Sequence, residues 1–387
     1  MFHRISRASV IITLALAATT SHAGNAFQDA TSFKSEDGDF KIKLTGRIHI
    51  DAATYDDDVT KMDDDVDLRR LRLGVKGTVM KDWSYTYNYD SESNVGYRVK
   101  SAYIRYKGFD NVSISVGNIQ QPFSLEELTS SNHIPLMERS LANVFAPSYT
   151  IGALVKTWGK HWSFAGGYFD DSLADRHNNN EGSHSLAARF TFNPIDRKGY
   201  KIHLGISTIY RSLGSNQTVS YSTRPESYVT DARLVSSSTL NDVDDIKTYG
   251  LEAALIKGSW LLQGETMRAE LSRKSDADPT FDGGYIQGGW IVTGENYRYS
   301  GKNGTLKQIR PKSKYGAVEL AVRYSSLDLE DKGVTGGEED NLTLGVNWHI
   351  NRNFRIMVNY IYADASPNRN GLDENADILQ LRVQAYF

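Results

Sequence analysis

KIKLTGRIHIDAATY, at residues 41–55, alternates apolar and polar side chains along most of its length. One face of this stretch is apolar and holds Ile42, Leu44, Ile48 and Ile50. A period of two residues is that of a β-strand whose two faces meet different surroundings. The stretch therefore predicts an amphipathic strand, and the question for the fold is what covers its apolar face.

The same alternation recurs along the rest of the chain and predicts five strands before residue 117 and eleven after residue 148, about sixteen in all. Short turns at 193–199 and 351–353 alternate with long polar stretches that we expect to be loops: 56–67, 171–182, 212–241 and 328–340. Short turns at one end and long loops at the other are typical of outer-membrane β-barrels. We therefore expect an all-β fold, a transmembrane antiparallel barrel.

Aromatic residues favour a membrane barrel over a soluble all-β protein, which would bury its apolar faces in a core. Here the polar faces carry cations and small residues, whereas many apolar faces end in tyrosine or tryptophan, as in aromatic girdles at the two membrane interfaces. These residues are Trp83, Trp162, Tyr168, Tyr200, Tyr210, Trp260, Trp290, Tyr324, Trp348 and Tyr362. The last strand alternates up to a terminal Phe387 and resembles the recognition strand of bacterial outer-membrane proteins.

The bulk composition of the 387 residues agrees with export to an oxidising compartment. There is no cysteine, which excludes disulfides and thiolate chemistry. Arg4 and Arg7 precede an apolar run at 8–18, and Ser21-His22-Ala23 resembles a cleavage site. We predict a signal peptide at 1–23, a short periplasmic segment at 24–40 and a single barrel domain at 41–387, in the outer membrane of a Gram-negative bacterium.

Residues 117–148 break the strand pattern. Pro122, Pro135 and Pro147 are incompatible with a continuous ladder, and Ser124 begins an S-x-x-E sequence that resembles a helix capping box. Loops of this length in compact folds are usually functional. We predict a long loop at about 119–148 that folds into the lumen of the barrel.

Charges are segregated between the predicted wall and the predicted loops. The polar faces of the strands are net basic and include Lys43, Arg47, Arg70, Arg72, Lys76, Arg105, Lys156, Arg189, Lys201, Arg211, Arg323, Arg355 and Arg382. Acidic residues concentrate in loops such as 56–67 and 241–245. A basic wall around water favours the passage of anions, and arginine suits oxyanions in particular. Scattered charges balanced by loop acids, with no anion preference, are the alternative.

Motifs for other functions are absent or weak. There is no G-x-S-x-G, P-loop, G-x-G-x-x-G or H-E-x-x-H sequence, and Ser130, Ser131 and His133 alone do not make a hydrolase. The acidic run 56–67 lacks the pattern of an EF-hand and is better explained as a solvated loop than as a calcium or lipopolysaccharide site. We expect no enzyme activity, no cofactor, no metal and no nucleic-acid partner.

Several runs resemble the phosphate-selective porin O and P family. They are GRIHID at 46–51, LRRLRLGVKG at 68–77, SAYIRYKG at 101–108, PFSLEELTSSN at 122–132, MERSL at 137–141, GAVELAVRYSSLDLED at 316–331 and TLGVNWHINRNFRIMVNY at 343–360. The resemblance implies a sixteen-stranded barrel, usually trimeric, whose third long loop constricts the pore. It implies small anionic solutes such as phosphate, with outer-membrane lipid and lipopolysaccharide as surroundings.

The resemblance also implies roles for individual residues. Arg69 and Arg70 match wall arginines of the family, Ser130 and Ser131 match serines of its constriction loop, and Arg139 matches an arginine there. Lys43, Arg47, Arg72 and Arg105 are added from the charge pattern, and we expect Arg70, Arg72, Arg105 and Arg139 to line or approach the constriction.

Two departures from the family pattern weaken the expectation of phosphate selectivity. Ser101 stands where the family often has an acid, and residues 119–148 contain no lysine. We therefore expect a porin for passive diffusion of small hydrophilic solutes that prefers anions through its wall, while the loop sets the size. The alternatives are a general porin with little anion selectivity and, less favoured, an outer-membrane enzyme or adhesin.

Overall fold

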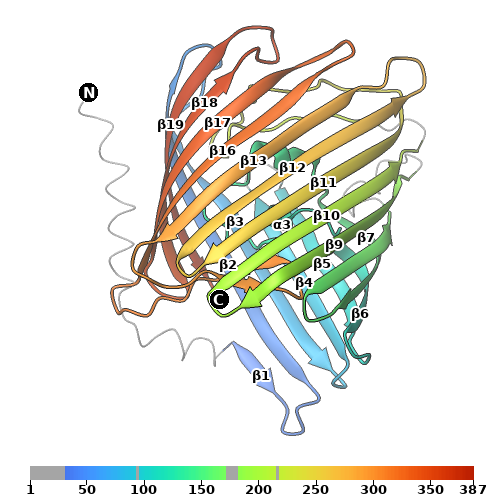
Figure 1. Ribbon diagram of the computed structural model, residues 1–387, viewed down its shortest axis with the longest axis vertical. Coiled ribbons are helices and arrows are strands. Elements are labelled where there is room, and N and C mark those ends of the chain that lie inside the picture. The colour runs from blue at the N-terminus through green and yellow to red at the C-terminus, as the bar shows by residue number, and fades with distance from the viewer. Residues whose placement is uncertain (1–30, 93–95, 171–181, 215–217) are drawn as a thin grey trace.

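The computed structural model describes residues 31–92, 96–170, 182–214 and 218–387. Within these ranges, sixteen strands pair antiparallel with their neighbours and close into a barrel (Figure 1), which confirms the predicted fold class and strand count. The predicted signal peptide lies outside the described residues. The barrel strands are β2 (Lys41–Asp57), β3 (Asp65–Val79), β4 (Trp83–Glu92), β5 (Gly96–Tyr106), β6 (Val112–Gln120), β7 (Tyr149–Trp158), β8 (Trp162–Phe169), β9 (His184–Arg197), β10 (Tyr200–Ser212), β11 (Val243–Lys257), β12 (Trp260–Arg273), β13 (Thr280–Ile291), β16 (Ala317–Asp331), β17 (Val334–His349), β18 (Phe354–Ala365) and β19 (Glu374–Tyr386).

The barrel closes where its last strand meets its first. β19 pairs with β2 over eleven residues, from Ala376 opposite Asp57 to Tyr386 opposite Arg47. The short strand β1 (Ser32–Lys34) pairs with the first residues of β2, which precede the stretch of β2 that pairs with β19. A closed sheet leaves no row of unpaired backbone groups, which is the condition for crossing a membrane with strands.

The two faces of the wall differ as the alternation predicts. Large apolar side chains are exposed on the outward face, for example Leu251 at 56% and Leu344 at 47%. The residues between them, such as Glu252 and Thr343, are buried on the inward face. An apolar outside around a polar inside is the reverse of a soluble protein and matches a barrel surrounded by lipid.

All six tryptophans lie near the end of the barrel at which β2 starts and β19 ends, which we call the turn end. Five of them are exposed on the outward face, and Trp260 and Trp290 stack with ring centroids 4.9 Å apart. At the opposite end, the loop end, exposed Tyr168, Tyr210 and Tyr324 replace them. Rings at both ends agree with the predicted aromatic girdles.

Two of the predicted connections are wrong. Residues 328–340 are not a loop, because β16 and β17 continue to a two-residue turn at Lys332 and Gly333, both with positive φ as a type I′ turn requires. The strand ends escaped prediction because acidic residues such as Asp328 and Glu330 replace the apolar side chains of the outward face there, whereas Leu327 and Leu329 are buried on the inward face. The acidic loop at 56–67 shrinks to 58–64 for the same reason.

The turn end also carries one long connection that the alternation did not reveal, the β13–β16 segment (residues 292–316). It contains a small hairpin of β14 (Arg298–Ser300) and β15 (Thr305–Lys307). Helical structure among the described residues comprises α3 (Leu125–Leu128) and the 3-10 turn η1 (Leu141–Phe145), both between β6 and β7. No helix in the described part of the chain is long and apolar enough to cross a membrane.

An outward charge in the middle of the apolar band should destabilise the barrel. We expect Leu251→Arg to lower the free energy of unfolding by about 2–4 kcal/mol, and Met80→Arg, in an exposed turn, by about 0–1 kcal/mol. Urea titration in phospholipid vesicles, followed by tryptophan fluorescence, measures both. Equal losses in the two variants would contradict the assignment of the outward face.

Candidate functional site

The β6–β7 segment (residues 121–148) starts with a helix whose N-terminus is held by the barrel wall. The Ser124 hydroxyl accepts a hydrogen bond from the Glu127 backbone N–H at 3.1 Å, as the S-x-x-E sequence predicts. Glu265 of β12 accepts two more, from the first two N–H groups of α3, at 2.9 and 2.7 Å. These are the donors that a helix leaves without internal partners. The start of α3 is therefore attached to the inward face of the sheet.

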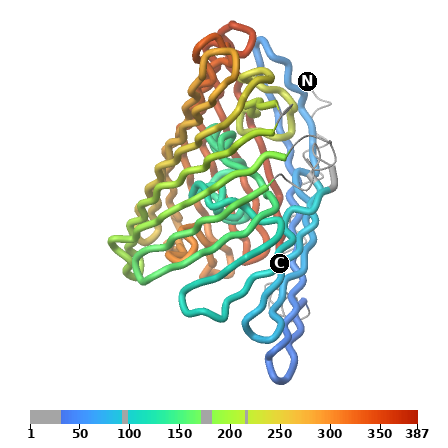
Figure 2. Tube along the Cα trace, turned by 90° about the vertical axis from the view of Figure 1, so that its right-hand side faces the viewer, coloured from blue at the N-terminus to red at the C-terminus, as the bar shows by residue number. Residues whose placement is uncertain are grey.

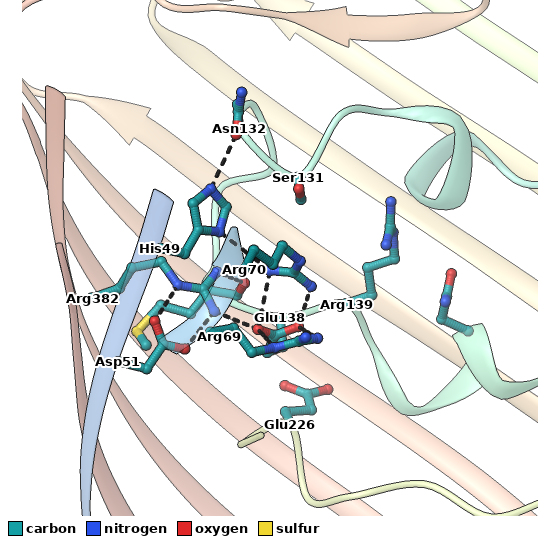
Figure 3. A network of polar contacts seen from close by, with 12 residues as sticks. His49, Asp51, Arg69, Arg70, Ser131, Asn132, Glu138, Arg139, Glu226 and Arg382 are labelled. Carbon is teal, nitrogen blue, oxygen red and sulfur yellow. Dashed lines mark hydrogen bonds and ion pairs between the residues drawn. The ribbon is translucent and has the colours of Figure 1, made fainter. Parts of the chain in front are cut away.

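Glu138 of the same segment lies at the centre of a cluster of arginines from the wall (Figure 3). Its carboxylate is 2.9 Å from Arg69 Nε and 3.0 Å from Arg70 Nη2, and it also accepts a hydrogen bond from Arg382. Arg382 in addition makes two hydrogen bonds to Asp51, at 2.7 and 2.6 Å. The Glu138 carboxylate thus joins β3 to β19, and Glu138 and its three arginine partners are all buried.

A β-bulge allows the adjacent Arg69 and Arg70 to reach the same carboxylate. The register between β2 and β3 shifts here, because Arg70 faces His49 whereas Asp67 faces Asp51. β3 therefore has one residue more than β2 over this interval, and a bulge turns a side chain out of strict alternation. Both arginines point inward, which neighbours in a regular strand cannot do.

The electrostatics of this cluster keep the Glu138 carboxylate ionised. Burial alone would raise the pKa of Glu138, but Arg69, Arg70 and Arg382 together hold it well below its usual value. Burial also raises the pKa of Glu126 in the same segment, and Arg323 only partly opposes that rise. The segment is therefore attached to the wall by charge-assisted contacts that are shielded from water.

Wall side chains from the other half of the barrel hold the backbone of the segment. Arg355 donates to the Ile134 carbonyl at 3.0 Å, and Asn347 donates to the Pro135 carbonyl at 2.6 Å. Arg323 donates to the Glu138 carbonyl at 3.1 Å, and Arg382 donates to the Met137 carbonyl. Arg323, Arg355 and Arg382, which the sequence places on the lumen side, therefore lie inward but are buried beneath the segment.

The inward face of β2 to β7 is less covered, and its cations face one another in pairs. Arg47 of β2 is directly opposite Arg72 of β3, and Lys43 is directly opposite Lys76. Arg47 donates to Ser131 at 2.6 Å, and Arg72 pairs with Asp90 at 2.6 Å. Among the described residues, no carboxylate forms an ion pair with Lys43, Arg47 or Lys76.

Arg105 of β5 extends this row of cations toward the turn end. It donates to Ser115 at 2.8 Å and lies over the ring of Tyr103 at 5.0 Å. Neither partner is charged, so its positive charge is not neutralised by these contacts.

Eight of the nine residues predicted for the site fall into two groups in the structure, and Ser130 belongs to neither. Arg69, Arg70, Ser131 and Arg139 bind the segment to the wall or to itself, whereas Lys43, Arg47, Arg72 and Arg105 line the less covered wall. Arg139 donates to the carbonyls of Glu126, Glu127 and Thr129 and pairs with Glu127. Ser130 is half-buried at the surface of the segment.

Sequence reasoning missed the central role of Glu138. It counted Glu138 as a loop acid, and no local pattern indicates that arginines from β3 and β19 converge on it. Sequence reasoning also did not identify Tyr149 as a contact of the wall cations. In the structure, the Lys100 ammonium group lies over its ring, 5.5 Å from the centroid. Within the described residues, no group of three or more acidic or histidine side chains is arranged to hold a metal ion.

The β13–β16 segment approaches the β6–β7 segment from the turn end. Tyr297 donates to Glu319 at 2.6 Å, and the Tyr299 hydroxyl lies 2.5 Å from His203 Nδ1. Leu306 N donates to Thr129 Oγ1 at 3.2 Å, so the two segments touch. Five of the six cations of this segment are exposed: Lys302, Lys307, Arg310, Lys312 and Lys314. Both segments lie within the outline of the trace in Figure 2.

Comparisons with known proteins agree with this architecture. The family model of phosphate-selective porin O and P matches residues 42–387. A protein of Caulobacter vibrioides is 30% identical over 93% of this chain and 76% of its own length. Porin O of Pseudomonas aeruginosa is 27% identical over 91% of this chain and 89% of its own length.

A solved structure, the anion-selective porin from Comamonas acidovorans, shares the fold with a TM-score of 0.60. It is 12% identical and covers 90% of this chain and 100% of its own. The barrel, its apolar outside and these relatives assign the protein to the outer membrane of a Gram-negative bacterium as a porin channel. The chain belongs to the phosphate-selective porin O and P family.

Proposed function

We propose that this porin prefers small anions, which pass along the inward face of β2 to β7. The observation that carries the proposal is the direct opposition of like charges, Arg47 to Arg72 and Lys43 to Lys76. Like charges opposite each other destabilise a sheet, so their stacking along one wall points to a function in which anions are the missing counter-charge.

The β6–β7 segment is proposed to narrow the pore on the side facing this wall. Its contacts with β2, β3, β12 and β16 to β19 support a fixed position inside the barrel. Two of its four charged residues, Glu126 and Glu138, are paired with wall arginines in those contacts, and the other two, Glu127 and Arg139, pair with each other. The wall therefore supplies the charge preference and the segment supplies the size limit.

Phosphate is one candidate solute, and a homotrimer surrounded by lipid and lipopolysaccharide is the assembly we propose from the family. A general porin with little selectivity is the second candidate. The pairing of Arg72 with Asp90 and of Arg70 with Glu138 favours it, because both arginines are partly or wholly neutralised. Inhibition of chloride current by millimolar phosphate separates the two candidates.

An enzyme built on Ser130, Ser131 and His133 is the least favoured reading. The Ser131 hydroxyl accepts from Arg47, and His133 packs against the ring of Tyr386 with centroids 6.3 Å apart. A lipid-hydrolysis assay with both serines replaced by alanine tests this reading directly.

Charge on the less covered wall should set ion selectivity. In planar bilayers under a KCl gradient we expect an anion-selective reversal potential, and Arg47→Glu should reduce the anion-to-cation permeability ratio by about fivefold, the effect of ~1 kcal/mol. Arg268→Glu, on the outward face and paired with Asp282, is the matched control and should leave the ratio unchanged. A cation-selective wild type would overturn the proposal.

Removing the charge of Glu138 should release the segment from the wall. Glu138→Gln leaves three buried arginines without their shared partner, and losing one member of a buried ion pair costs about 3–5 kcal/mol. We expect a lower free energy of unfolding in urea and a larger, noisier single-channel conductance. Glu138→Asp keeps the charge and serves as the control; a quiet, wild-type conductance in Glu138→Gln would argue against this anchor.

The segment should also keep its position across mild acid. The pKa of Glu138 is lowered on folding, so its stabilisation is complete above the unfolded value of about 4.3 and is lost only as the pH falls through the lower folded value. Burial, with Arg355 and Arg47 nearby, lowers the pKa of His133 to about 3, so that it remains neutral. Conductance should be constant from about pH 8 to 5; a step near the ordinary pKa of histidine, about 6.5, would contradict these assignments.

A further inference from the structure

Glu127 differs from the other two acids of the β6–β7 segment. Glu126 and Glu138 are buried in ion pairs with wall arginines. Glu127 forms no ion pair with the wall among the described residues, and its side chain is 11% exposed. Its carboxylate is held instead by Gln120 at the end of β6 and by Asn143 and Arg139 of the segment.

Arg139 does not simply cancel this carboxylate. Its guanidinium makes three hydrogen bonds to backbone carbonyls of residues 126, 127 and 129, at 3.2, 2.9 and 3.2 Å, around the C-terminus of α3. Those carbonyls carry the negative end of the helix peptide dipoles and share the arginine charge. Three donors meanwhile keep the Glu127 carboxylate in one orientation at the edge of the segment, where it remains partly accessible to water.

Tyr149 connects this edge with the cationic wall. Its hydroxyl donates to Gln120 at 3.4 Å, and Gln120 in turn donates to Glu127 at 2.5 Å. Lys100 lies over the ring of Tyr149 at 5.5 Å and pairs with Asp90 at 3.4 Å. Asp90 also accepts a hydrogen bond from Arg72 at 2.6 Å, and Arg47 is directly opposite Arg72. A negative group on the segment and positive groups on β2 and β3 are thus arranged around one half-buried tyrosine.

We propose that Glu127 and the Arg47–Arg72 pair form a two-pole constriction that admits zwitterionic solutes of amino-acid size beside small anions. The solute's carboxylate faces the arginines and its ammonium group faces Glu127. This inference rests on the proposed function, because it uses the same wall cations and the same narrowing. It adds that the segment contributes a charge of its own to the choice of solute.

A matched pair of solutes isolates the effect of the ammonium group. L-alanine and L-lactate are nearly the same size and share a carboxylate, but only alanine carries a positive charge at neutral pH. In liposome swelling, Glu127→Gln should reduce the alanine-to-lactate rate ratio by about threefold, the size expected for a partly exposed charge contact. Glu127→Asp, which retains the charge, should keep the wild-type ratio.

Swelling in glycerol normalises each variant for the number of open pores, so a folding defect does not imitate the effect. An unchanged or higher alanine-to-lactate ratio in Glu127→Gln would overturn the inference, and so would a Glu127→Asp variant that behaves like Glu127→Gln. The wild-type reversal potential in KCl is measured separately. A pore without anion preference but with a Glu127-dependent ratio would therefore contradict the proposed function and not the role of Glu127.

Discussion

Closure of the sheet is the constraint on which the rest of this structure depends. A bilayer offers no water to backbone N–H and C=O groups, so β19 must pair with β2 and every strand must be satisfied by its neighbours. Closure also separates the two faces of each strand completely. Apolar side chains point to lipid and polar side chains point to a shared interior, and the functional chemistry is therefore concentrated on the inward face.

The inward face uses its arginines in two different ways. On the side of β16 to β19 they are buried under the β6–β7 segment and bind its carbonyls and carboxylates. On β3, Arg69 and Arg70 are likewise buried against Glu138. The remaining cations that line β2 to β7 are half-buried or exposed, and several have no acidic partner among the described residues. A buried arginine that is paired with a carboxylate stabilises the structure. The cations that stay in contact with water and have no acidic partner are those that we propose to attract anions. The position of the β6–β7 segment therefore decides which wall cations are buried in ion pairs and which remain in contact with water.

Contacts from both ends of the barrel fix that position. The β6–β7 segment comes from the loop end and the β13–β16 segment from the turn end, and they meet where Leu306 donates to Thr129. A buried apolar cluster that includes Leu125, Leu306 and Ile309 joins them. A segment supported from two directions can be rigid without a disulfide, which this cysteine-free chain cannot form.

The amino-acid sequence by itself determined the barrel, its sixteen strands, the orientation of their faces and the segment that interrupts them. These properties depend on periodicity along the chain, which residues 41–55 already show. The sequence also placed Lys43, Arg47, Arg72 and Arg105 on the wall. Only the tertiary structure decided that Arg69 and Arg70 both turn inward at a bulge, that Glu138 joins them to Arg382, and that 328–340 is a hairpin. Such features depend on residues far apart in the chain, whose charges acquire partners when the barrel closes and the segment packs against its wall.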